Sequence, residues 1–172
     1  MALAAGLPAA AAAHRQSACA GAGLLPTATN VRSIGAATLC LINDVRAAWR
    51  LGPVRANGEL RWLAAKQVRD MVRHHYFADV RPDGLTPMAV LGATSYRSHT
   101  ASVSVAQNIA WGTGTAATPA AIVAAWMASP PHRRVILTGS FRDAGVYTVP
   151  AVPLRLAQGY GATYAIEFGT RR

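Results

Sequence analysis

The sequence AGVYTVPAVPLRLAQGYGATYAIEF (residues 144–168) decides the fold class of this chain. Its two ends, residues 144–149 and 162–168, are rich in the β-branched and aromatic residues that are typical of strands. In the second run, two sets of residues alternate: Ala162, Tyr164, Ile166 and Phe168 against Thr163, Ala165 and Glu167. The two runs are predicted to pair as an antiparallel hairpin around the loop 150–161.

Four segments before this hairpin carry helix signals. They begin at Ser33, Asn57, Thr86 and Thr118, each of which can cap a helix, and they end at Gly52-Pro53, at His74-His75, near Leu91 and at Pro130-Pro131. Residues 92–118 are rich in Gly, Ser and Thr and are expected to be irregular. Helices first and strands last predict an α+β domain in which helices flank a small antiparallel sheet.

The composition limits the class of protein. The 172 residues are 52% hydrophobic and 14% charged, which predicts one folded domain. No apolar run reaches the roughly 18 residues of a membrane-spanning helix, so no transmembrane segment is expected. The 17 Lys and Arg against 7 Asp and Glu give a net charge of +10, which favours anionic partners. Because the basic residues are scattered along the chain, nucleic acid is not an expected partner.

Residues 1–13 have features of a secretory signal. The segment is uncharged and ends in three alanines directly before His14-Arg15, which suits signal peptidase, although no Lys or Arg precedes the apolar run. The alternative is an apolar N-terminal helix or tail. We therefore divide the chain into a signal-like segment (1–13), an N-terminal arm (14–33) and one domain (34–172), and we expect the mature protein to be extracellular or in the cell envelope.

The two cysteines, Cys19 and Cys40, are an even count in a chain with export features. One disulfide that ties the N-terminal arm to the first helix is the expected arrangement. The alternative is a pair of buried free thiols.

Common enzyme signatures are absent from the sequence. It has no HExxH metalloprotease helix, no GxSxG nucleophile elbow and no phosphate-binding loop. The stretch 112–117 (GTGTAA) has the spacing of a dinucleotide fingerprint, but no acidic residue follows about 20 positions later. A Rossmann-type dehydrogenase is therefore excluded.

A series of short motifs resembles one protein family. The motifs are Cys40–Arg46, Asp70-Met71, Phe77 with Pro82–Pro87, Gln107–Ala110, Trp126–Arg133, Phe141–Val146 and Tyr164–Gly169. In this order and spacing they resemble the bacterial branch of the CAP superfamily, whose members are related to cysteine-rich secretory proteins, venom allergens and plant pathogenesis-related proteins. The resemblance covers residues 36–169. It implies an α-β-α sandwich with a central cleft, where two histidines and two acidic residues can hold zinc.

The sequence departs from this family at the cleft positions. Asp79 stands where the first histidine is expected, Gln107 replaces a glutamate, and His132 is kept. No Asp or Glu lies between Asp83 and Asp143, so both cleft carboxylates are expected to be missing. Since zinc sites need three or four His, Cys or carboxylate ligands, Asp79 and His132 predict at most weak zinc binding, and no cofactor is expected.

The resemblance places the cleft at Asp79, Gln107, Asn108, Ser129 and His132. Each has a simpler alternative: Asp79 as a turn residue, the two amides as loop organisers, and His132 as a partner of backbone groups. We expect a secreted, non-enzymatic binding module for a lipid, a cell-wall component or a protein. Two alternatives are a weak hydrolase that uses Asp79 and His132 as an acid-base pair, and a polyanion-binding protein that uses an Arg-rich surface.

Overall fold

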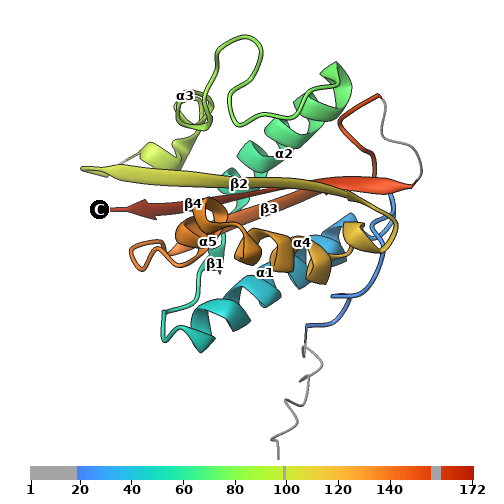
Figure 1. Ribbon diagram of the computed structural model, residues 1–172. Coiled ribbons are helices and arrows are strands. Elements are labelled where there is room, and N and C mark those ends of the chain that lie inside the picture. The colour runs from blue at the N-terminus through green and yellow to red at the C-terminus, as the bar shows by residue number, and fades with distance from the viewer. Residues whose placement is uncertain (1–18, 99, 156–159) are drawn as a thin grey trace, which may run out of the picture.

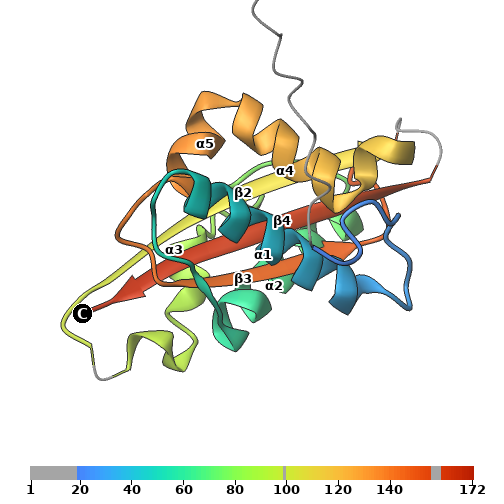
Figure 2. The same ribbon diagram turned by 90° about the horizontal axis from the view of Figure 1, so that it is seen from below.

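The protein is an α-β-α sandwich. A computed structural model describes residues 19–98, 100–155 and 160–172. One face of the central sheet is covered by α2 (Gly58–His74) and α3 (Pro87–Leu91) (Figure 1). The other face is covered by α1 (Val31–Ala48), α4 (Pro119–Ala128) and α5 (Pro130–Ile136), which lie across the sheet in Figure 2. The predicted fold class is confirmed.

The sheet has four strands in the order β1-β3-β4-β2. They are β1 (Arg55–Ala56), β2 (Val103–Thr113), β3 (Asp143–Val149) and β4 (Gly161–Arg171). The predicted hairpin is confirmed, since β3 pairs antiparallel with β4. Strand β2 also pairs antiparallel with β4, from Val103 opposite Arg171 to Thr113 opposite Gly161. The sheet is mixed rather than purely antiparallel because β1 runs parallel to β3.

Strand β4 lies at the centre of the protein and is buried on both faces. Tyr164, Ile166 and Phe168 join the core that β4 shares with α1, α4 and α5. Ala165 packs with residues of α2 on the opposite face. The alternating residues of β4 therefore face two different helix layers, rather than a core on one side and solvent on the other.

The secondary structure differs from the expectation in two places. The stretch 103–113, expected to be irregular, forms β2, because its 11 residues pair continuously with β4 and carry the strand-like alternation of Val103, Val105, Ile109 and Trp111. The helix expected to end at Pro130-Pro131 does end just before them, at Ala128, but Pro130 also occupies the first turn of an unexpected helix, α5, where proline is tolerated. Two short 3-10 turns, Ser95–Arg97 and Gly114–Ala117, flank β2.

The helix caps mostly follow the sequence. The Asn57 side chain accepts hydrogen bonds from the amides of Glu59 and Leu60, and Thr86 and Thr118 cap α3 and α4 in the same way. The first helix begins at Val31 rather than after Ser33.

The predicted disulfide between Cys19 and Cys40 is present and ties the arm to α1. The signal-like segment 1–13 and residues 14–18 lie outside the described residues. In the part of the chain that the structure describes, no helix combines the length and apolar character needed to cross a membrane.

A buried arginine ties the end of α1 to the end of α5. Arg46 is fully buried, and its guanidinium donates hydrogen bonds to the carbonyls of Gly52, Ile136, Thr138 and Phe141. Burial lowers the pKa of this side chain. Arg46 thereby satisfies carbonyls at the end of α5 and in the chain leading to β3.

Candidate functional site

A polar pair, the buried Glu167 and the half-buried Gln107, lies at the centre of the sheet, on the face covered by α2. The register of β2 and β4 places Gln107 directly opposite Glu167, and Gln107 Nε2 donates a hydrogen bond to Glu167 Oε1. Burial, with a smaller contribution from the nearby charge of Asp79, raises the pKa of Glu167 to about 8 against the opposing effect of the Gln107 hydrogen bond. At neutral pH the Glu167 carboxyl is therefore mostly protonated.

Glu167 corrects the expectation that the predicted cleft has lost its carboxylates. That expectation considered only the chain between Asp83 and Asp143, whereas strand pairing brings a carboxyl group from β4 to Gln107. The sequence contained a signal for this carboxyl group, because Glu167 is the one charged residue in the otherwise uncharged run 161–169. A charged residue in a strand buried on both faces needs a polar partner.

This pair retains unused hydrogen-bonding capacity. Gln107 Oε1 and Glu167 Oε2 are buried, and neither has a hydrogen-bond partner among the residues that the structure describes. An amide beside a protonated carboxyl offers one acceptor and one donor, which is the chemistry of hydrogen bonding rather than of nucleophilic attack.

Asp79 lies in the segment that follows α2 and is exposed. Its backbone is held by α2, because Gln67 Nε2 donates to the carbonyl oxygens of Ala78 at 2.8 Å and of Asp79 at 3.4 Å. The segment is also anchored at Asp70, whose carboxylate accepts hydrogen bonds from Tyr76 and Arg81, both at 2.7 Å. Burial would raise the pKa of Asp70, but these bonds and the Arg81 charge outweigh it and lower the pKa.

The remaining predicted cleft residues lie on the other side of β2. Asn108 follows Gln107 in the strand, so the two side chains point to opposite faces. Asn108 Nδ2 donates to the backbone carbonyl of His132 on α5 at 3.0 Å, and Ser129 precedes that helix as its N-cap residue. No hydrogen bond or ion pair joins Asp79 to His132, both of which are described residues.

A zinc ion does not fit these residues. Among the residues in the ranges 19–98, 100–155 and 160–172, the one group of three His, Cys, Asp or Glu side chains with ligand atoms within 4.8 Å of one another is Cys19, Cys40 and Asp44. The sulfurs of that group are joined in the disulfide. Asp79 and His132 belong to no such group, so they do not supply a tetrahedral ligand set.

Comparison with known proteins agrees with the fold. The sequence model of the cysteine-rich secretory protein family, CAP, matches residues 39–152, and the chain belongs to this family. Among curated protein sequences, none matches.

Solved bacterial structures share the fold at low sequence identity. An outer surface protein from Borrelia burgdorferi is 17% identical with a TM-score of 0.62, over 78% of this chain and 90% of that one. An extracellular protein containing an SCP domain from Bacillus anthracis is 19% identical with a TM-score of 0.63, over 83% of this chain. A cysteine-rich secretory protein from Staphylococcus aureus is 16% identical with a TM-score of 0.60, also over 83%. This chain spans 43% and 40% of the last two proteins.

Proposed function

We propose that this CAP domain is a secreted binding module that docks on an anionic lipid surface and catalyses no reaction. Support for secretion comes from the apolar segment 1–13 and from the Cys19–Cys40 disulfide, since such bonds persist in oxidising compartments. Two structural relatives, an outer surface protein and an extracellular protein, point the same way.

One observation carries the lipid part of the proposal. Four large apolar side chains are exposed within a span of 12 residues after α2: Phe77 (37%), Val80 (50%), Leu85 (42%) and Met88 (37%). This segment arches over the α2 layer, on the side of the sheet away from α1 and α4 (Figure 1). Exposed apolar side chains concentrated in one segment mark interaction surfaces, whereas isolated ones do not.

The adjoining face of α2 is basic. Helical spacing places Trp62, Lys66, Arg69 and Arg73 on one outward stripe, and all four are exposed. The Lys66 ammonium lies 5.2 Å from the centre of the Trp62 ring. Apolar side chains beside Lys, Arg and Trp suit the boundary between anionic headgroups and acyl chains.

The positions of the candidate acid-base residues favour binding over hydrolysis. Asp79 is exposed on the α2 side, whereas His132 lies on α5 and makes no bond with it. The buried Glu167 is mostly protonated at neutral pH and pairs with an amide, so it is a poor general base. Zinc binding is expected to be weak because the candidate ligands, Asp79 and His132, do not lie close together.

Vesicle sedimentation tests the proposal. The protein should sediment with vesicles of phosphatidylcholine and phosphatidylglycerol in a 3:1 ratio and much less with phosphatidylcholine alone. Replacing Phe77 and Leu85 together by Ser, or Lys66 and Arg73 together by Gln, should weaken binding about tenfold, whereas Arg134→Gln on α5 should not.

Three results would contradict this function. Sedimentation with purified peptidoglycan but not with vesicles would make the ligand a wall polymer. Retention on heparin to high salt without vesicle binding would favour a general polyanion site. Turnover of p-nitrophenyl esters that is lost in His132→Ala would make the protein a hydrolase.

A further inference from the structure

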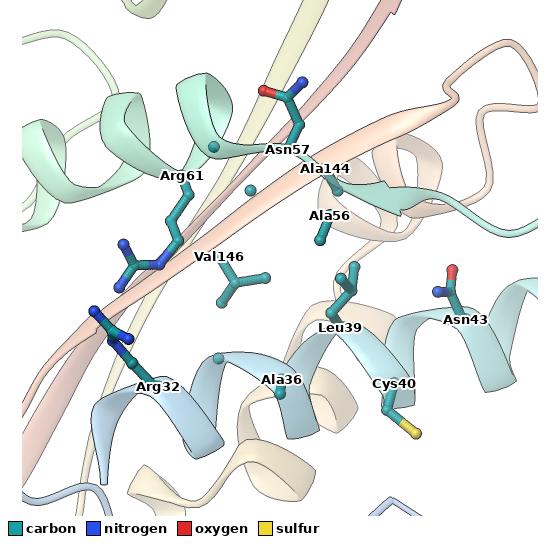
Figure 3. Close-up of a pocket in the computed structure, with 13 residues that line it drawn as sticks. Arg32, Ala36, Leu39, Cys40, Asn43, Ala56, Asn57, Arg61, Ala144 and Val146 are labelled. Carbon is teal, nitrogen blue, oxygen red and sulfur yellow. The ribbon is translucent and has the colours of Figure 1, made fainter. Parts of the chain in front are cut away.

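A groove of about 620 Å³ opens at the β3 side of the sheet, away from the apolar segment 77–88. Its walls are α1 below and the start of α2 above, and β1 and β3 lie between them (Figure 3). Leu39, Ala36 and Val146 give it an apolar lining. The volume falls within the range of about 300 to 1,000 Å³ that is typical of small-ligand pockets.

Two arginines stand at one end of this groove. Arg32 from α1 and Arg61 from α2 are exposed, and Figure 3 shows their guanidinium groups facing one another. Neither makes an ion pair with any residue that the structure describes. Arg61 also lies over the ring of Tyr147, 5.0 Å from its centre, which orients the side chain. Two unpaired guanidinium groups that face each other are stabilised by an anion held between them, and carboxylates match their geometry best.

Beyond Ala144 the sheet edge that lines the groove is open in one sense: no described strand pairs with it, while Val146 itself is 6% exposed. Strand β1 pairs with β3 only as far as Ala144, whose carbonyl accepts a hydrogen bond from the Asn57 amide at 2.8 Å. Because successive peptide groups of a strand alternate in direction, the N–H and C=O of Val146 face the same side as that carbonyl. No strand pairs with Val146 on this side among the described residues. An open edge of this kind can pair with the backbone of an extended peptide.

We propose that this groove binds the C-terminal residues of a peptide. The terminal carboxylate lies between Arg32 and Arg61, the last apolar side chain packs on Leu39 and Val146, and the peptide backbone pairs with Val146. The open edge favours a peptide over a fatty acid, which has a carboxylate but no backbone to pair. This site goes beyond the proposed lipid docking and does not depend on it.

Fluorescence anisotropy with matched peptides tests the site. The probes are fluorescein-labelled pentapeptides Gly-Ser-Gly-Ala-Xaa in which Xaa is Ala, Val, Leu or Phe, each with a free carboxylate and as the C-terminal amide. At least one acid should bind with a dissociation constant below 1 mM, and its amide at least tenfold more weakly. Arg32→Gln should weaken binding of the acid about tenfold, whereas Arg134→Gln, which removes the same charge from α5, should not. Methylating the backbone nitrogen of the last residue should also weaken binding.

Several outcomes would overturn the assignment. These are no saturation by any acid below 1 mM, equal binding of acid and amide, or an unchanged affinity in Arg32→Gln. Binding of sodium laurate that depends on Arg32, without peptide binding, would assign an acyl anion instead. The peptide site and the lipid surface are tested independently of each other. Arg32→Gln should retain vesicle binding, and the Phe77 and Leu85 double variant should retain peptide binding.

Discussion

Replacing Glu167 by Gln should remove most of the loss of stability that the protein shows between acidic and weakly basic pH. The ordinary pKa of 4.5 applies to the unfolded chain, and burial raises the pKa of Glu167 in the folded state to about 8. Between these values the folded state holds a proton that the unfolded state has released, so the stability from this group is complete below pH 4.5 and falls as pH rises toward 8. At about 1.4 kcal/mol per pH unit, the total loss is about 4 to 5 kcal/mol.

The Glu167→Gln side chain keeps the size and neutral charge of the protonated acid and can still pair with Gln107. Urea unfolding at pH 5, 6, 7, 8 and 8.5, with the disulfide intact, measures the free energy of unfolding of both proteins. The free energy of unfolding of the variant, relative to that of the wild type, should increase steadily as pH rises. Contributions of other titratable groups, such as Asp70, are the same in both proteins and cancel in this difference.

Asp79→Asn provides a matched control for this experiment. Removing the Asp79 charge should lower the pKa of Glu167, so that the loss of stability ends at a lower pH and is smaller. Equal pH dependence in wild type and Glu167→Gln would show that Glu167 ionises normally and would refute the account of the buried pair.

Four further predictions concern the scaffold and metal binding. Arg46→Met should cost roughly 3 to 5 kcal/mol in urea unfolding, because four backbone carbonyls lose their buried donor; a cost below about 1 kcal/mol would contradict this role. Replacing Cys19 and Cys40 together by Ser should cost about 3 kcal/mol and lower the melting temperature by several degrees. Gly145→Ala should cost at least about 3 kcal/mol, since its new Cβ would lie 2.0 Å from the Arg61 amide nitrogen, whereas Gly52→Ala meets nothing within 4 Å and should be neutral. Micromolar zinc should leave the melting temperature unchanged in calorimetry, and a rise of many degrees would show a tight site.

Local signals were sufficient where they were strong. The Asn57 cap and the apolar stripe after it predicted α2 almost to the residue, because caps and helical periodicity act within a few residues. The same holds for the β3–β4 hairpin, whose strands carry β-branched and aromatic residues on both sides of a single loop. Strand β2 was missed because its pairing partner lies about 60 residues away and because the wider stretch 92–118 is rich in Gly, Ser and Thr. Within that stretch, the alternation of Val103, Val105, Ile109 and Trp111 was a strand signal.

The sequence by itself determined four of the five α-helices that the structure describes, the hairpin and the disulfide. It also placed Asp79, Gln107 and His132 at the cleft positions of a family pattern that only His132 keeps. Only the tertiary structure decided which of these side chains meet. The antiparallel register of β2 and β4 joins Gln107 to Glu167, and the two-residue alternation of β2 sends Asn108 to the face where α5 carries His132. Such partners are set by strand pairing across the sheet, a long-range interaction that no local pattern along the chain encodes.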